Sequence, residues 1–455
     1  MSAPPALPRR NARLYASGSF AGNLATRVVS AWLFYFYAAE DSDGDATRRM
    51  AVWLVGAILT TTSLISAFDD PLIGQWSDRT RSRWGRRLPF ILFATPPWAL
   101  LFFLLWTPPV AGESMVNAVY LGVVLMLFRV FSTLAGGPQE ALLPEIAPRN
   151  EDRVRIVVAQ VFFATLSAAV ALVAVGPVID LVGFQTMAAG VALLAFGSRM
   201  LALAGVWRYA RRDVPPVEGG LFAAFRTPFR NDQFLIFLPT FVLFNFGITL
   251  MTAALPFYAD EVLRPSSGRV GTYAAILTAA PIGVLLLSLP LLQRLALTWG
   301  KARVYARAML LGAVYLPLLF FMGFVPGVPA LVQGILFMAP VGLAMAGVFV
   351  FPNALMADII DYDATRTGER REGVYYAAQN LIETLVGALH ALALAGLLLL
   401  GGTAADPLGL RLVGPVAAAG IFLGWLIFRR YSLPDSVGGD HLPAAPTQAA
   451  GEQPA

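Results

Sequence analysis

A long apolar run gives way to charge at residues 69–87, which read DDPLIGQWSDRTRSRWGRR. Apolar sequence precedes this stretch from residue 50 and resumes at residue 88. Two apolar runs of about 20 residues, each long enough to cross roughly 30 Å of hydrocarbon, therefore flank a short basic loop. This boundary predicts two membrane-spanning helices joined on the side of the membrane where arginine collects.

The rest of the 455-residue chain repeats this pattern. It is 57% hydrophobic and only 13% charged, which leaves too little polar surface to cover a water-soluble globule of this size. The apolar runs predict an all-α membrane protein with twelve transmembrane helices. The predicted spans are residues 14–38, 50–76, 88–108, 115–143, 154–179, 184–207, 233–258, 271–292, 304–325, 329–357, 373–401 and 409–428.

Basic residues fall almost entirely on one side of the predicted membrane. If the N-terminal segment is cytoplasmic, the loops on the other side hold only Arg48, Arg49, Arg264, Arg269 and Arg411 of the 33 lysines and arginines. The positive-inside rule then places both termini in the cytoplasm, and we expect a multi-pass protein of a bacterial-type inner (plasma) membrane. The short basic start is followed by no small-residue cleavage site, so we expect the first helix to be retained.

The longest predicted cytoplasmic loop divides the spans into six and six. Residues 141–146 at the end of the fourth span resemble residues 354–359 at the end of the tenth, and residues 84–87 resemble residues 299–301 at a nearly equal offset. This similarity indicates duplication and predicts two pseudo-symmetric halves with a solute site between them. The predicted division is 1–207 for the first half, 208–232 for a cytoplasmic linker, 233–430 for the second half and 431–455 for a disordered cytoplasmic tail.

Residues 69–87 resemble the signature of the glycoside-pentoside-hexuronide:cation symporters, the melibiose permease family of the major facilitator superfamily. Residues 138–153, 357–362 and 368–376 agree with the same family, so the resemblance covers nearly the whole chain. It implies the major facilitator fold and a secondary active transporter that works by alternating access. It further implies cation- or proton-coupled symport of a sugar-like or anionic small solute, with Na⁺ or H⁺ as coupling ion and no other cofactor.

Charges at the predicted cytoplasmic edge are candidates for a gate. In the first half Asp78 can pair with loop arginines, and Gly85 permits a tight reversal of the chain. Equivalent charges in the second half could form ion pairs that break and re-form as the halves rock, or could only anchor helix ends. The gate candidates are Asp78, Arg79, Arg83, Arg86, Asp358, Asp361, Arg370 and Arg371.

Ionisable residues near the middle of the spans are candidates for ion and solute binding. Asp70 lies roughly 9 Å along its helix from Trp76, and a charge near a helix centre costs about 2.5 to 3.5 kcal/mol, so Asp70 should face a cavity or a partner. The same depth argument places Arg27, Arg129 and Glu383 around one polar cavity. Each arginine could bind solute or only neutralise Asp70.

The eleventh predicted span carries a polar stripe. Gln379, Glu383 and His390 fall at helical spacing, so one face could line the cavity. Either Glu383 or His390 could carry a coupled proton, or could only pack against its neighbours. Uncharged groups such as Asn23, Thr133, Gln160, Asn245 and Asn380 could bind solute or only join helices.

The resemblance also implies roles for single residues. Asp70 and Thr133 fall at cation-site positions of the family, Asp69 stands where melibiose permease has asparagine, and Ser66 replaces a second aspartate. Most sugar-contacting positions differ, Asn23 and Glu140 among them, so we expect a different solute, and Arg27 and Arg129 favour an anion such as a hexuronate. The candidates for cation or proton coupling are Asp70, Asp69, Thr133 and Ser66, and those for substrate binding are Asn23, Arg27, Arg129, Glu140, Gln160, Gln379, Asn380 and Glu383.

Other classes of function fit less well. An exporter or a carrier of lysolipids and other amphiphiles shares this architecture, and an apolar lateral opening would favour it. An enzyme is disfavoured because the sequence offers no nucleophile elbow and no phosphate-cradling loop. With no cysteine and two histidines we expect no metal site, and arginines that punctuate apolar helices predict no nucleic-acid partner. The expected partners are a small solute and membrane lipid, and the expected state is a monomer.

Overall fold

The computed structural model describes residues 7–39, 48–67, 72–73, 76–77, 80, 82–147, 149–209, 228–265, 268–369 and 371–434. Within these ranges the chain is helical and contains no strand. Eight helical stretches there are long and apolar enough to cross a membrane, and Val52–Ser66 and Leu88–Leu104 are shorter apolar helices. The predicted all-α membrane fold is thereby confirmed, whereas the count of twelve spans stays a prediction.

The first group of helices ends near residue 206, with a sharp reversal inside the last of them. Gly183 has a φ of 78°, in the left-handed region that favours glycine, and the predicted fifth and sixth spans meet there. The elements are α1 (Arg9–Ala38), α2 (Val52–Ser66), α4 (Leu88–Leu104), α5 (Met115–Ala141), α6 (Leu143–Ile146), α7 (Asn150–Ala169), the π-helical η1 (Val170–Ala174) and α8 (Val175–Val206).

The second group begins with the short η2 (Pro228–Arg230) and α10 (Asp232–Phe257). The predicted span 329–357 is divided here into three helices, with breaks at Pro340 and just before Pro352, because proline cannot donate a backbone hydrogen bond within a helix. The remaining elements are η3 (Tyr258–Leu263), α11 (Val270–Trp299), α12 (Lys301–Tyr315), η4 (Leu316–Phe321), α13 (Ala330–Met338), α14 (Val341–Val350), α15 (Pro352–Thr367), α16 (Glu372–Leu399) and α17 (Leu408–Phe428).

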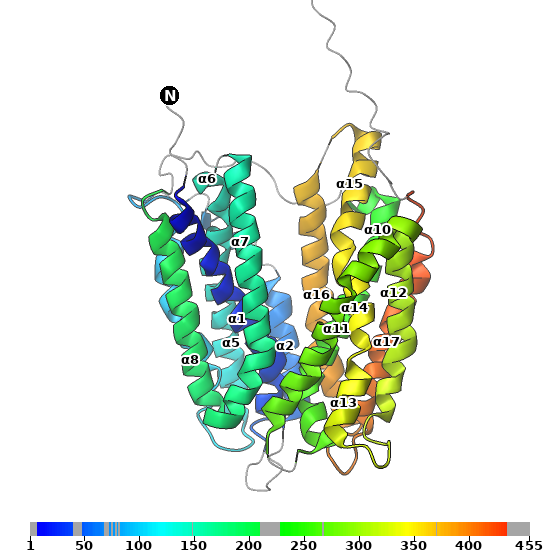
Figure 1. Ribbon diagram of the computed structural model, residues 1–455. Coiled ribbons are helices and arrows are strands. Elements are labelled where there is room, and N and C mark those ends of the chain that lie inside the picture. The colour runs from blue at the N-terminus through cyan, green and yellow to red at the C-terminus, as the bar shows by residue number, and fades with distance from the viewer. Residues whose placement is uncertain are drawn as a thin grey trace, which may run out of the picture.

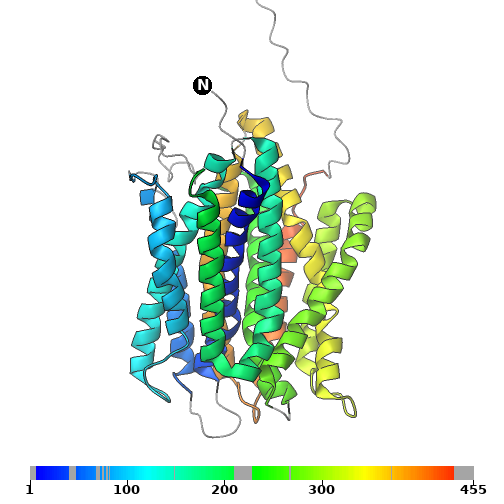
Figure 2. The same ribbon diagram turned by 60° about the vertical axis from the view of Figure 1, so that its left-hand side comes forward.

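The two groups form two bundles. Figure 1 shows α1 to α8 on one side and α10 to α17 on the other, and Figure 2 shows the same long helices running between two ends of the molecule. We name the end that carries the start of α1 and the end of α17 the terminal end, and the other the distal end. In Figure 1 the bundles lie apart at the terminal end and come together at the distal end.

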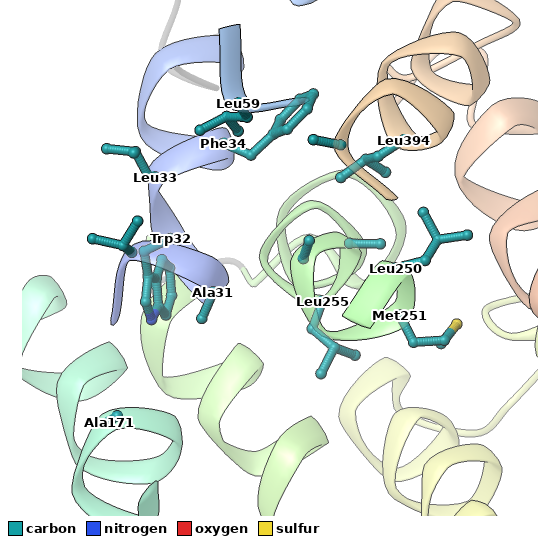
Figure 3. Close-up of a cluster of buried hydrophobic side chains, with 14 of the residues drawn as sticks. Ala31, Trp32, Leu33, Phe34, Leu59, Ala171, Leu250, Met251, Leu255 and Leu394 are labelled. Atoms are coloured by element: carbon teal, nitrogen blue, oxygen red, sulfur yellow. The ribbon is translucent and has the colours of Figure 1, made fainter. Parts of the chain in front are cut away.

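An apolar cluster joins the bundles toward the distal end. Trp32 and Phe34 of α1 and Leu59 of α2 pack in one buried cluster with Leu250 of α10 and Leu394 of α16, as Figure 3 shows. Close packing of this kind, rather than exclusion of water, holds helices together within a bilayer. The cluster therefore fixes how the two bundles meet.

Polar contacts reinforce the same junction. The Asp180 carboxylate of α8 accepts hydrogen bonds from the backbone nitrogens of Gly271 (2.7 Å) and Thr272 (2.6 Å) in the first turn of α11. These N–H groups have no partner within their own helix, and a negative charge there is stabilised by the helix dipole. Tyr35 of α1 also donates to Asp260 of η3 at 2.7 Å. The distal end is therefore closed by contacts between bundles.

Ion pairs at the terminal end have a different pattern. Among the described residues, each of them joins groups of the same bundle, such as Arg86 with Glu145 (2.6 Å) in the first and Lys301 with Asp358 (2.6 Å) in the second. Together with the separation of the bundles in Figure 1, this pattern indicates that the described parts of the two bundles are attached to each other mainly at the distal end.

Candidate functional site

A polar cavity of about 510 Å³ lies in the first bundle, between α1, α5, α7 and α8. Its volume is in the range of sites for small molecules. The polar side chains in its wall are Asn23, Thr133, Gln139, Glu140, Gln160 and Arg199. A second cavity, of about 630 Å³, lies at the distal end, where Phe36, Phe184 and the loop residues 110–112 line it. The 510 Å³ cavity combines charges of both signs with amides, so it is the candidate site.

Glycines on α1 shape this cavity. A Cβ added at Gly18 would overlap the side chain of Gln139, so only glycine lets α1 and α5 approach there. Tyr15, one turn earlier, is fully buried and donates to the backbone oxygen of Gln139. A Cβ at Gly22 would lie 3.1 Å from Nη2 of Arg199. The absence of side chains on this face of α1 therefore leaves room beside the guanidinium.

Four of the residues predicted from sequence come together in this wall. Asn23 lies on α1, Thr133 and Glu140 on α5, and Gln160 on α7. The Asn23 amide nitrogen donates to the backbone oxygen of Ser19 at 2.9 Å, within its own helix. Its amide oxygen can accept a hydrogen bond from a solute.

The predicted arginines Arg27 and Arg129 and the coupling candidate Ser66 lie elsewhere along α1, α5 and α2. Arg27 is exposed on α1, one turn beyond Asn23. Arg129 of α5 donates to the hydroxyl of Ser63 on α2 at 2.8 Å, and the Ser66 hydroxyl donates to the Ser63 backbone oxygen at 3.0 Å. The candidates Asp69 and Asp70 lie outside the described residues, so their roles stay predictions.

The polar stripe of α16 is separate from the wall of the 510 Å³ cavity. Gln379 is buried, Asn380 is exposed, and half-buried Glu383 makes no hydrogen bond or ion pair within the described part of the chain. The His390 ring bonds the backbone oxygen of Gly387 in its own helix. Near this stripe α16 packs on α2, where the Thr60 hydroxyl donates to the Ala388 oxygen at 3.0 Å.

One predicted gate residue of the first bundle, Arg86, contacts a buried carboxylate. Glu145 of α6 accepts from Nε (2.9 Å) and Nη2 (2.6 Å) of Arg86 and lies 3.0 Å from Nη1 of Arg87. The guanidinium of Arg83 lies over the ring of Trp84 instead, 4.8 Å from its centroid. The candidates Asp78 and Arg79 fall outside the described ranges.

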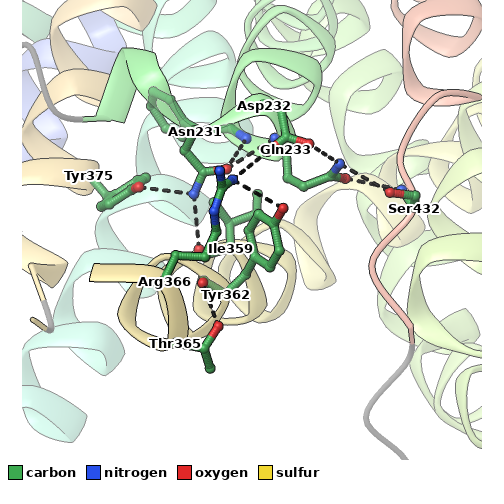
Figure 4. Close-up of polar contacts among 10 residues, drawn as sticks. Asn231, Asp232, Gln233, Ile359, Tyr362, Thr365, Arg366, Tyr375 and Ser432 are labelled. Atoms are coloured by element: carbon green, nitrogen blue, oxygen red, sulfur yellow. Dashed lines mark hydrogen bonds and ion pairs between the residues drawn. The ribbon is translucent and has the colours of Figure 1, made fainter. Parts of the chain in front are cut away.

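The gate candidates of the second bundle lie around α15, the last helix before α16. Asp358 pairs with Lys301, and Arg371 pairs with Glu369 at 2.6 Å, while Asp361 is exposed and Arg370 lies outside the described residues. Figure 4 shows a neighbouring network in which Asn231 donates to Tyr375 (2.9 Å) and to the Ile359 oxygen (3.2 Å). This network ties η2 and α10 to α15 and α16.

Two residues of the structure, Arg199 and Glu145, were not predicted as functional candidates from the sequence. Arg199 lies within a predicted span but was not among the candidates, and its place in the cavity wall depends on how α8 is rotated. Glu145 was noted as part of a repeat, and its role as the partner of Arg86 and Arg87 depends on the fold of α6 against α4. In both cases the available signal was a charge in a predominantly apolar segment.

Comparison with known proteins gives a consistent result. The model of the family described as MFS/sugar transport protein matches residues 14–409. The chain is 27% identical over 372 residues to the uncharacterized symporter YnaJ of Bacillus subtilis, which covers 80% of this chain and 77% of that protein. It is 24% identical over 376 residues to the glucuronide carrier protein homolog of Escherichia coli, again covering 80% of this chain and 77% of the relative.

Solved structures agree on the fold. The nucleoside transporter NupG superposes with a TM-score of 0.63 at 13% identity, over 93% of this chain and 98% of that chain. At this identity the likeness concerns the fold alone. Together with the family match, it confirms the expected major facilitator architecture.

Proposed function

Because the chain belongs to the MFS/sugar transport protein family, we propose that it carries a sugar-like or anionic small solute, coupled to Na⁺ or H⁺, across a bacterial inner membrane. The chain is a multi-pass membrane protein and a secondary active symporter, and its relatives are transporters rather than enzymes. The observation that carries the proposal is the polar 510 Å³ cavity in a bundle that meets its neighbour at the distal end. Alternating access requires a solute site that opens to one side of the membrane at a time.

The distribution of arginine supports a cytoplasmic terminal end. The loops that this orientation places in the cytoplasm include residues 79–87, whereas the opposite loops hold few basic residues. In this orientation the distal contacts face away from the cytoplasm, and the bundles lie apart toward it. The structure would then be the inward-facing state, from which solute is released into the cell.

The lining of the cavity supports a polar solute. Asn23, Gln160 and Glu140 offer amide and carboxylate groups that suit sugar hydroxyls, and Arg199 suits an anion. The name of the glucuronide carrier relative is in line with a solute of this kind. A lysolipid or amphiphile carrier, or an exporter, is the alternative, and an apolar wall would support it better than this polar one.

Coupling is proposed to involve Asp70, Asp69, Thr133 and Ser66. Thr133 lies in the wall of the cavity, which supports a link between the ion and the solute site. A carboxylate between low-dielectric helices can bind either Na⁺ or a proton. The two six-helix halves (1–207 and 233–430), the linker 208–232 and a monomeric state complete the proposal, and each of them follows from the sequence pattern.

We expect Asp70→Asn to abolish uptake driven by an ion gradient while leaving solute exchange intact. The amide keeps the size of the side chain but cannot take up a proton or balance the charge of Na⁺. The measurement is uptake by proteoliposomes of radiolabelled sugars, uronates and lysolipids, under an imposed Na⁺ or proton gradient, with counterflow measured in parallel. The expected result is at least a tenfold loss of accumulation with counterflow retained.

Asp406→Asn is the matched control, because it makes the same chemical change at an exposed loop position outside the proposed site and gate. It should accumulate solute like the unchanged protein. Gradient-independent transport in the unchanged protein, or normal accumulation by the Asp70 variant, would contradict the proposed coupling. Uptake of lysolipids alone would favour the amphiphile carrier.

A further inference from the structure

We infer that Arg199 binds an oxyanion of the transported solute, which makes a carboxylate-bearing sugar the substrate class of this cavity. The inference rests on the proposed function and adds both the residue and the charge of the solute. Arg199 is only 3% exposed, yet it lies in the wall of the 510 Å³ cavity. A buried guanidinium at such a position needs hydrogen-bond acceptors.

No group of the described chain accepts a hydrogen bond from this guanidinium. Arg199 makes no hydrogen bond and no ion pair there, and its Nε and Nη1 are buried without an acceptor. Glu140 lines the same cavity and its charge acts on Arg199, but no hydrogen bond or ion pair joins these two side chains. A buried cation that no carboxylate contacts directly is unfavourable unless another group compensates the charge. An anionic solute would provide this compensation each time it enters.

The residues around Arg199 orient its guanidinium so that one nitrogen can contact a solute. Its carbon lies 4.4 Å from the ring centroid of Trp98, which is fully buried on α4. This cation–π contact offsets part of the cost of burial and fixes the plane of the guanidinium. With Nε and Nη1 buried, Nη2 remains to meet the solute, beside the space that Gly22 leaves open.

The other polar groups of the cavity suit the remainder of a sugar acid. Asn23 on α1 and Gln160 on α7 carry amides that can both donate to and accept from hydroxyl groups. Glu140 can accept from hydroxyls, and its charge disfavours a solute whose carboxylate approaches α5. These groups together favour one orientation, with the carboxylate toward α8 and the hydroxyls toward α1 and α7.

The test compares matched solutes that differ in charge. Uptake by proteoliposomes is measured for D-glucuronate with D-glucose and for D-galacturonate with D-galactose, with the unchanged protein, Arg199→Gln and Arg199→Lys. Because a hydrogen bond to a charged group is lost, KM for the carboxylate member should rise roughly 10- to 100-fold in Arg199→Gln. Arg199→Lys, which keeps the charge, should retain part of the affinity.

Controls distinguish loss of solute binding from misfolding of the variants. Size-exclusion profiles and melting temperatures show whether the variants fold, and Arg153→Gln removes an exposed arginine of α7 as a matched change. The inference is overturned if the unchanged protein carries the neutral member at least as well, or if Arg199→Gln raises KM for both members equally. If the unchanged protein carries no member of the panel under any gradient, the proposed function fails and this inference fails with it.

Discussion

Replacing Glu145 by alanine is expected to destabilise the first bundle by about 3 to 5 kcal/mol, the usual cost of breaking a buried ion pair. Glu145 has a side chain only 6% exposed, and the guanidinium groups of Arg86 and Arg87 that contact it are 9% and 8% exposed. Without the carboxylate, both buried guanidinium groups lose the partner that they share at 2.6 and 3.0 Å. The consequence should be a large drop in thermal stability.

The measurement is the melting temperature of the purified protein, followed by loss of the monodisperse peak in size-exclusion chromatography. Glu145→Gln should be less severe, because its amide oxygen still accepts a hydrogen bond from Arg86. Glu151→Ala removes an exposed carboxylate from the first turn of α7 and should change the melting temperature little. A Glu145→Ala protein as stable as the unchanged one would show that the ion pairs do not hold this end of the bundle.

Gly176→Leu is expected to force the distal ends of the bundles apart and to shift the protein toward the state open at that end. A Cβ added at Gly176 would overlap the backbone oxygen of Gly271 in the other bundle, and this backbone cannot move as a side chain can. Overpacking of this kind costs about 1 to 3 kcal/mol. Since the cost falls on the closed distal end alone, the ratio of the two states should change by roughly 5- to 150-fold.

The absence of cysteine makes this shift measurable. A single cysteine placed at the exposed cavity residue Thr26 can be labelled with a membrane-impermeant maleimide applied from the distal side. Labelling from that side should be faster in Gly176→Leu than in the parent. Gly190→Leu is the matched control on α8, because a Cβ there meets nothing within 4 Å. Equal labelling rates in all three proteins would mean that the distal contact does not control access.

The sequence predicted the helices well, because a bilayer leaves few alternatives to apolar helices of fixed length. It was less successful where a helix continues beyond the membrane. The tenth span was expected to end at residue 357, where carboxylates begin, yet α15 runs to Thr367. Lys301 neutralises Asp358, and Gly368, with a φ of 75°, ends the helix. Gly368 therefore marked the end of the helix correctly, whereas the carboxylates from Asp358 onward did not.

The lining of the 510 Å³ cavity was predicted in part, for a related reason. Polar residues on α1, α5 and α7 could be chosen from the sequence, and Asn23, Thr133, Glu140 and Gln160 do meet in one cavity. Depth in the membrane follows from counting residues, whereas the direction of a side chain depends on how each helix is rotated against its neighbours. Arg199 enters the wall because Trp98 packs beneath its guanidinium, a contact between α8 and α4 that no spacing rule contains.

Distances between spin labels would test the central claim, that the two bundles rock about this cavity to open each end in turn. One pair of cysteines, at Arg153 and Gly373, would report on the terminal ends of α7 and α16, and another, at Met115 and Leu408, on the distal ends of α5 and α17. All four positions are exposed. In lipid nanodiscs, introducing Gly176→Leu should shorten the first distance and lengthen the second in the same fraction of molecules. If the two distances change independently, or if neither changes, the bundles do not move as the account requires.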